Sequence, residues 1–160
     1  GNVGTRLGKL ASGLCDATFL AYAGLKRLER LDAVTDIVPL ETMLCAPAQA
    51  AIGIEIRASD TEAANVAGQL DHTDTAWCVA AERAFLEALD GSCKTPIAAL
   101  AEWQYGEIRL RGQVLSTDGS FEVSRDTVGA VRSVDDARKI GTAMGQDVLD
   151  AIGDRNIWGD

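Results

Sequence analysis

The stretch EIRLRGQVL, residues 107–115, alternates apolar and polar side chains along its whole length. In an extended chain this period of two places Ile108, Leu110 and Val114 on one face. The opposite face then carries Glu107, Arg109, Arg111 and Gln113. A second strand-like stretch, residues 121–128, follows after Asp118-Gly119, which is a strong hairpin signal. The pattern predicts an antiparallel hairpin with one buried and one exposed face.

The segments on either side of this hairpin complete a compact unit. Residues 97–103 predict a further strand, and Gly91 marks the end of a helix that Thr73 or Asp74 can cap and that runs to about Leu89. After the hairpin, Ser133 can cap a helix reaching about Ile152. Residues 73–160 are therefore expected to form an α+β unit with a small three-stranded antiparallel sheet packed on helices.

The first 70 residues predict α/β structure instead. We expect helices at Thr5–Leu10, which Gly13 can end, at Gly24–Leu31, and from a cap at Asp60 to about Leu70. Strands are expected over three ranges: Cys15–Ala23, Leu40–Leu44 and Ile52–Arg57. The run at residues 17–21 is typical of a strand buried on both faces. Because this region offers few neighbours for such a strand, we expect its partners in a segment N-terminal to Gly1.

Composition and charge exclude several classes of protein. With 47% hydrophobic and 24% charged residues, the chain has the profile of a folded globular protein. No apolar run has membrane-spanning length, which argues against a membrane protein. The net charge of −9 argues against a nucleic-acid binder. The chain starts at Gly1 without an initiator Met, which indicates a fragment, a processed product or an excised piece.

The cysteines indicate free thiols in a cytoplasmic protein. Cys15, Cys45, Cys78 and Cys93 form no C-x-x-C pair, and His72 is the single histidine of the sequence. This set argues against a zinc site. A Cys–His hydrolase is also disfavoured, because His72 is the one candidate base and no oxyanion or orienting motif accompanies it. We interpret His72 as a loop residue or a partner at the start of a helix.

Cys93 is the cysteine with the most suggestive surroundings. It stands in the loop DGSCKTP, residues 90–96, directly after a helix end and two small residues. Such a loop can present a side chain outward, and the neighbouring Lys94 favours a thiolate. The ordinary alternative is a small buried hydrophobic residue, which is the commonest role of an isolated cysteine.

Five segments, in order, resemble the porphobilinogen deaminase (hydroxymethylbilane synthase) family. The loop LDGSCKTPI, residues 89–97, resembles the family's cofactor-attachment loop, and AERAFL at 81–86 resembles the helix leading to it. The others are GNVGTRL at 1–7, LAYAGLKRL at 20–28, and 43–55, which contains APAQ and IGIE. The resemblance covers nearly the whole chain, more loosely after about residue 105.

The resemblance implies a three-domain protein. It has a periplasmic-binding-protein-like two-domain α/β core and a C-terminal α+β domain. Residues 1–44 would be the later part of domain 2. Residues 45–70 would be the hinge and the return segment of domain 1, and residues 73–160 would be domain 3. Only domain 3 is expected to fold alone. The intact enzyme would be a cytoplasmic monomer that binds neither nucleic acid nor membrane.

The resemblance also implies a transferase activity. The family joins four porphobilinogen units into hydroxymethylbilane and releases ammonia, with the growing chain held through a dipyrromethane cofactor on a cysteine. By this match Cys93 carries the cofactor through a thioether, so its thiol acts as an anchor. Each pyrrole brings two carboxylates, and Arg6 and Arg27 match arginines that bind them with paired, charge-assisted hydrogen bonds. Gly1, Asn2 and Gln49 match further positions near the cofactor, whereas Lys26 and Arg30 are interpreted as surface charges.

Two features qualify this assignment. The family's catalytic Asp belongs to an N-terminal domain outside these residues, so no catalytic residue is assigned here, and the chain alone is expected to be inactive. Cys45 and Ala50 stand where the family usually has Pro and Gly, and an Ala at a position of positive φ costs about 1 kcal/mol. The alternative function is a truncated relative that acts as a non-catalytic binding or interaction module without cofactor.

Overall fold

The computed structural model describes residues 2–91 and 95–158 of the chain. The chain divides into two compact units, Gly1–Met43 and Leu44–Asp160. The first contains α1 (Val3–Ala11), α2 (Tyr22–Arg27) and the short 3₁₀ helix η1 (Leu31–Ala33). The second contains α3 (Thr61–Gly68) and all the remaining elements. Among the described residues, no helix combines the length and the apolar character needed to cross a membrane.

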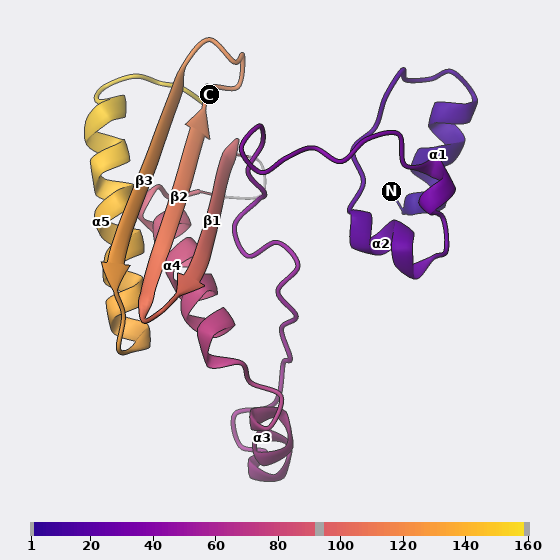
Figure 1. Ribbon diagram of the computed structural model, residues 1–160. Coiled ribbons are helices and arrows are strands. Elements are labelled where there is room, and N and C mark those ends of the chain that lie inside the picture. The colour runs from indigo at the N-terminus through magenta and orange to yellow at the C-terminus, as the bar shows by residue number, and fades with distance from the viewer. Residues whose placement is uncertain (1, 92–94, 159–160) are drawn as a thin grey trace. The chain divides into compact units, whose positions relative to one another are not determined.

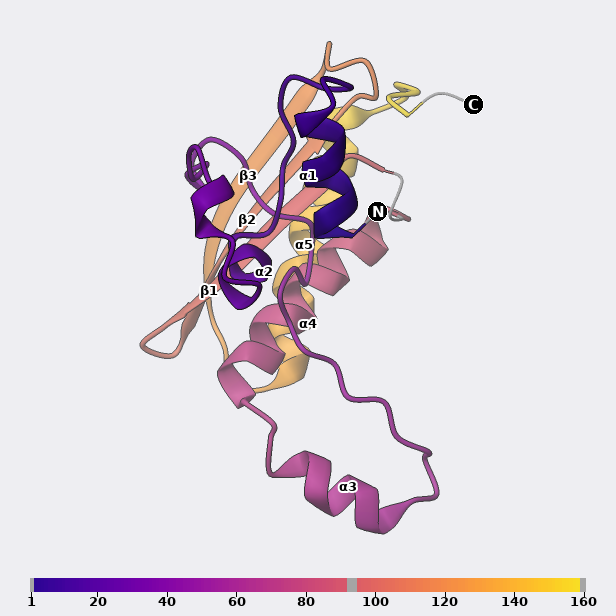
Figure 2. The ribbon, with the colours of Figure 1, turned by 90° about the vertical axis from the view of Figure 1, so that its right-hand side faces the viewer.

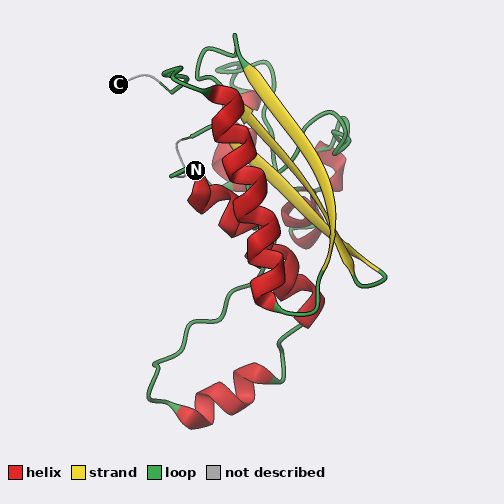
Figure 3. Cartoon of the chain, turned by 90° about the vertical axis from the view of Figure 1, so that its left-hand side faces the viewer, coloured by secondary structure: helices red, strands yellow, loops and turns green. Residues whose placement is uncertain are grey.

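The sheet of the second unit is a three-stranded antiparallel meander. Its strands β1 (Ile97–Gln104), β2 (Glu107–Leu115) and β3 (Glu122–Ala130) lie in the order β1-β2-β3. The helices α4 (Thr73–Ala88) and α5 (Val134–Ile152) cover one face of this sheet (Figures 1 and 3). The predicted hairpin is confirmed: Gly119 has φ 71°, and the Asp118 carboxylate accepts a hydrogen bond from the Ser120 N–H at 3.0 Å.

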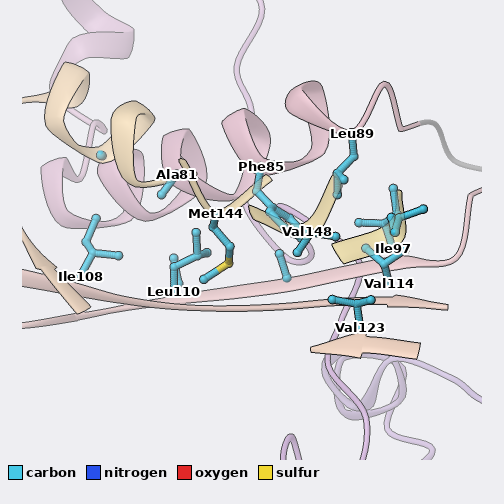
Figure 4. Close-up of a cluster of buried hydrophobic side chains, with 14 of the residues drawn as sticks. Ala81, Phe85, Leu89, Ile97, Ile108, Leu110, Val114, Val123, Met144 and Val148 are labelled. Carbon is cyan, nitrogen blue, oxygen red and sulfur yellow. The ribbon is translucent and has the colours of Figure 1, made fainter. Parts of the chain in front are cut away.

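The alternation along β2 separates the core from an exposed charged face. The side chains of Ile108, Leu110 and Val114 are fully buried under the two helices. They pack with Phe85, Leu89 and Val148 (Figure 4). Burying one such side chain stabilises a fold by about 1.5–3 kcal/mol. On the other face, Arg109 binds Asp126 at 2.5 Å and Arg111 binds Glu102 at 3.0 Å. The predicted division of β2 into two faces is confirmed.

Glycines let the two helices and the sheet approach one another closely. A Cβ on Gly141 of α5 would collide with the backbone carbonyl of Ala81 on α4. A Cβ on Gly145 would lie 2.5 Å from the Cβ of Ala88, and one on Gly112 of β2 would lie 2.7 Å from the Phe85 ring. The missing side chains therefore set the spacing of α4, α5 and β2.

We predict that Gly141→Ala destabilises the protein by about 3 kcal/mol, because the added methyl group meets rigid backbone. Gly68→Ala is the matched control, since Gly68 is also helical and a Cβ there meets nothing within 4 Å. That change is expected to be neutral or to stabilise by up to about 1 kcal/mol. Urea unfolding of both variants measures the difference. Equal stabilities for the two variants would contradict the role given to Gly141.

Two of the three predicted helix caps are confirmed. The Ser133 hydroxyl accepts a hydrogen bond from the Asp136 N–H at 3.2 Å, and the Asp60 carboxylate accepts one from the Ala63 N–H at 3.0 Å. The prediction that Thr73 or Asp74 caps α4 is wrong. His72 is the N-cap, and its Nδ1 accepts a hydrogen bond from the Thr75 N–H at 3.3 Å. The interpretation of His72 as a partner at a helix start is thereby confirmed.

The helices predicted in the first 70 residues are present with shifted ends. Helix α1 is longer than predicted and ends before Gly13, which has φ 72° as expected for a stop. Helix α2 begins and ends earlier than the predicted Gly24–Leu31. The left-handed residue Glu29, with φ 55°, ends it because the Arg30 N–H turns back to the Leu25 carbonyl at 2.9 Å.

The three strands predicted in the first 70 residues are wrong for this structure. Residues 15–21 are irregular and run into α2, residues 40–42 form a turn, and residues 52–57 have no regular structure. A strand needs a neighbour for its backbone N–H and C=O groups, and these segments pair with no strand among the described residues. Their apolar side chains are exposed accordingly, Phe19 by 67% and Ile52 by 91%.

Candidate functional site

Helix α4 ends in a turn that fixes the entry to the loop of Cys93. The Asp90 N–H binds the Glu87 carbonyl and the Gly91 N–H binds the Leu86 carbonyl, both at 3.0 Å. This is a Schellman-type ending whose left-handed residue is Asp90, with φ 49°. Gly91 was predicted to be the stop residue, but its role is steric. A Cβ there would lie 2.6 Å from the Ile97 side chain.

The exit from the same loop is fixed by β1 and β2. The Ile97 N–H binds the Thr95 carbonyl at 2.8 Å, and the Leu115 N–H binds the Pro96 carbonyl at 3.0 Å. The residues on both sides of positions 92–94 are therefore held by backbone hydrogen bonds. Cys93 itself lies outside the described residues, as does Gly1.

The 45–51 loop lies against β1, the strand that follows the Cys93 loop. The Ala99 N–H of β1 donates a hydrogen bond to the Cys45 carbonyl at 3.0 Å. The Gln49 N–H turns back to the Ala46 carbonyl at 3.0 Å. Ala48 and Ala50 adopt left-handed backbone, with φ 60° and 68°. Such conformations normally favour glycine, so this loop carries backbone strain.

Glu82 of α4 holds the 45–51 loop through its carboxylate. The side chain is only 6% exposed. Its Oε2 accepts a hydrogen bond from the Ala48 N–H at 2.6 Å, and its Oε1 accepts one from the Ala101 N–H of β1 at 2.7 Å. Burial raises the pKa of this carboxyl, and the two backbone hydrogen bonds act in the opposite direction.

Glu82 was not predicted from the sequence as a functional residue. Its signal was present, because Glu82 stands three and seven residues before Phe85 and Leu89, which places it on their buried face of the helix. A charged residue at such a position needs specific partners. What the sequence did not reveal is that those partners are backbone groups of two distant segments.

A hollow of about 440 Å³ opens beside this carboxylate. Trp103 of β1 stands at its wall in edge-to-face contact with Trp77 of α4, with ring centroids 5.2 Å apart. Residues of the 45–51 loop, the start of α4 and β1 line the hollow: Ala48, Gln49, Ala50, Ala51, His72, Asp74, Thr75, Cys78, Val79, Glu82, Leu100, Ala101 and Trp103.

The thiol of Cys78 in this hollow is unsuited to act as a nucleophile. Its pKa is raised to about 11, first by burial and then by the charges of Glu82, Asp74 and Glu102. The thiol is therefore protonated at neutral pH. Although His72 lines the same hollow, its Nδ1 is engaged at the N-cap of α4, so the pair does not form an activated Cys–His site.

The predicted anion-binding residues lie in the first unit. Arg6 is on α1 and Arg27 is the last residue of α2, and both side chains are exposed. Neither guanidinium group makes a hydrogen bond or ion pair with another described residue. Asn2 is the N-cap of α1, and its side chain accepts from the Thr5 N–H at 2.9 Å. Gln49 is exposed at the hollow of the second unit. Figure 2 shows α1 and α2 from a second direction.

Comparison with known proteins covers both units. Residues 1–65 match the family model "Porphobilinogen deaminase, dipyromethane cofactor binding domain", and residues 76–150 match "Porphobilinogen deaminase, C-terminal domain". The chain is 46% identical over 152 residues to the porphobilinogen deaminase of Paracoccus denitrificans, which covers 95% of the chain and 46% of that relative.

The chain belongs to the porphobilinogen deaminase family.

A plant relative gives the same result. The chain is 43% identical over 154 residues to "Porphobilinogen deaminase, chloroplastic" of Pisum sativum, which covers 96% of the chain and 42% of that relative. The chain thus spans somewhat less than half the length of these curated relatives. It corresponds to the end of the cofactor-binding domain followed by the C-terminal domain of a porphobilinogen deaminase.

The structure gives a physical meaning to one departure from the porphobilinogen deaminase pattern. Position 50, where the family usually has Gly, has φ 68°, so the condition under which Ala is unfavourable there is met. Ala48, which the sequence analysis did not single out, has the same backbone conformation. At the other departure, Cys45, the backbone carbonyl accepts the hydrogen bond from β1.

We predict that Ala50→Gly stabilises the second unit by about 1 kcal/mol, because glycine adopts the left-handed region without a steric penalty. Ala51→Gly is the control, since Ala51 is not among the residues of positive φ and gains only chain entropy in the unfolded state. That variant is expected to lose up to about 1 kcal/mol. Equilibrium unfolding in urea compares the two. A destabilised Ala50→Gly would show that strain at position 50 is not relieved by glycine.

Proposed function

We propose that this chain is the C-terminal portion of a hydroxymethylbilane synthase. The whole protein joins four porphobilinogen units into hydroxymethylbilane and releases ammonia. The observation that carries the proposal is the 46% identity to a porphobilinogen deaminase across 95% of the chain. The match to the C-terminal domain model, residues 76–150, includes the loop of Cys93. Turnover is proposed to require residues that the relatives carry outside the matched segment.

Cys93 is proposed to carry a dipyrromethane cofactor through a thioether. When bound, this group supplies the covalent anchor on which the pyrrole chain is held. Support comes from the anchored residues on both sides of the loop, Gly91 and Pro96, which confine where a group attached between them can reach. The reducing, cytoplasmic setting that such a thiol needs is also a proposal. It is supported by the free state of Cys15, Cys45 and Cys78.

Arg6 and Arg27 are proposed to bind the carboxylates of the cofactor and substrate. A guanidinium can donate two parallel hydrogen bonds to one carboxylate. Neither guanidinium group donates a hydrogen bond to another described residue. The residues present therefore fit an anionic group. Asn2 is proposed to contribute backbone groups, because its side-chain Oδ1 caps α1, and Gly1 is assigned by resemblance alone. Gln49 is proposed to contact the pyrrole chain from the 45–51 loop.

The domain assignment is also a proposal. Residues 1–44 would belong to domain 2, residues 45–70 would form the hinge and return segment of domain 1, and residues 73–160 would form domain 3 of a monomeric enzyme. The buried hydrophobic cluster lies wholly within residues 77–158, which supports domain 3 as the self-sufficient part.

The intact mass of the full-length protein tests cofactor attachment. We expect the wild type to exceed its sequence mass by two pyrrole units, and we expect Cys93→Ala to lose that increment. Cys78→Ala is the control and should keep it, because the Cys78 thiol is protonated and partly buried. An aldehyde reagent for pyrroles with a free α-position gives an independent readout. A full-length wild type without the increment would contradict the proposal and favour a non-catalytic binding module.

Substitution of Arg27 tests the proposed carboxylate binding. We predict that Arg27→Gln in the full-length protein raises the KM for porphobilinogen about ten- to a hundredfold, the cost of losing charge-assisted hydrogen bonds of about 1.5–3 kcal/mol. Arg30→Gln is the matched control, because Arg30 is exposed nearby but already binds Asp32 at 3.2 Å. Steady-state kinetics of both variants provides the measurement. An equal response of the two variants would remove Arg27 from the binding site.

A further inference from the structure

Three segments distant in the sequence meet at one carboxylate in the second unit. Glu82 lies on α4, and it accepts hydrogen bonds from Ala48 in the 45–51 loop and from Ala101 in β1. We infer that Glu82 is a positioning residue: its carboxylate holds the 45–51 loop, and with it Gln49, on the helix that leads to Cys93. The effect of Glu82 on the pyrrole chain rests on the proposed function. The inference that Glu82 holds the 45–51 loop does not.

The edge of the sheet explains why an acceptor is needed at this place. Strand β1 is the outer strand, so every second N–H along it points away from β2. The Ile97 N–H, at the start of the strand, is satisfied by the Thr95 carbonyl, and the next outward N–H, on Ala99, is satisfied by the Cys45 carbonyl. The 45–51 loop then turns away from the strand, and the Glu82 carboxylate satisfies the next N–H, on Ala101. Glu82 thus completes the pairing that the loop begins.

The strain in the loop explains why its position depends on a strong contact. Ala48 and Ala50 both occupy left-handed backbone, which is unfavourable for a residue with a Cβ. A free loop would relax to less strained conformations. Ala48, one of the strained residues, is also the residue whose N–H binds Glu82 at 2.6 Å. A hydrogen bond to an ionised acceptor is stronger than one between neutral groups, so this contact opposes relaxation of the strained loop.

The surroundings of Glu82 offer no substitute for these backbone donors. The titratable groups facing the hollow beside it are His72, Asp74 and Cys78, with Glu102 acting from β1. The described lining contains no Lys or Arg side chain. The carboxylate is therefore balanced by the Ala48 and Ala101 N–H groups, and loss of the carboxylate leaves these donors without an acceptor.

Amide exchange in the chain itself tests whether Glu82 holds the loop. Gln has nearly the same shape as Glu, but one of its two terminal atoms donates hydrogen bonds. In Glu82→Gln we expect hydrogen exchange at Ala48 to be faster by at least about tenfold, and exchange at Ala101 to rise as well. Glu87→Gln on the same helix is the control, because Glu87 is exposed. Unchanged exchange at Ala48 in a folded Glu82→Gln variant would overturn the inference.

A measurement on the wild type keeps the inference testable if that variant fails to fold. The Ala48 and Ala101 amide resonances should shift together with the Glu82 carboxyl resonance as pH is lowered. Because burial raises the pKa of this carboxyl, their common midpoint should lie above the ordinary value of 4.5. If the chemical shifts of the Ala48 and Ala101 amides do not change as Glu82 titrates, the inference is overturned.

Kinetics of the full-length protein distinguishes a positioning role from a purely structural one. We expect Glu82→Gln to keep the mass increment of the attached pyrroles but to lower kcat by about tenfold, since Gln49 is no longer held relative to the anchor. Unchanged kcat would overturn the positioning role. A wild type without attached pyrroles would contradict the proposed function instead. The amide measurements need no cofactor and would then still decide whether Glu82 holds the loop.

Discussion

The close contact of α5 with α4 at Gly141 is the constraint on which the second unit depends. A helix carries side chains all round, and two helices normally lie too far apart for one backbone to touch the other. Glycines at positions 141 and 145 remove this obstacle opposite Ala81 and Ala88. The two helices therefore pack closely together, and Gly112 lets the ring of Phe85 pack directly against β2. The core is small, so its stability depends on such close packing.

This packing determines where α4 ends and which of its faces is buried. Because α4 is held along its length, its C-terminal turn at Asp90 and Gly91 delivers the chain to the loop of Cys93 from a fixed position. The same packing turns Glu82 toward β1 and the 45–51 loop, where its charge is compensated by two backbone donors. One helix thereby connects the proposed anchor for the cofactor with the loop that carries Gln49.

The two cysteines associated with α4 illustrate how surroundings separate chemical roles. Cys78 lies within the helix beside three carboxylates, and its raised pKa keeps it as a thiol. Cys93 follows the end of the same helix in the sequence, between Gly91 and Pro96. Cys93 is the anchor in our proposal, and the electrostatics around Cys78 give an independent reason why the Cys78 thiol is not the alternative.

The sequence by itself determined the elements whose contacts are local. The alternation in residues 107–115, the Asp118-Gly119 turn and the caps at Asp60 and Ser133 involve residues close in the chain, and each prediction from them is confirmed. Only the tertiary structure decided features that need distant partners. The strand predicted at residues 52–57 did not form, because no described strand pairs with it. Ala48 and Ala50 became left-handed, and Glu82 became a buried acceptor, because β1 lies beside the 45–51 loop. Periodicity reports which face of a segment is apolar, but it cannot report which other segment will meet that face.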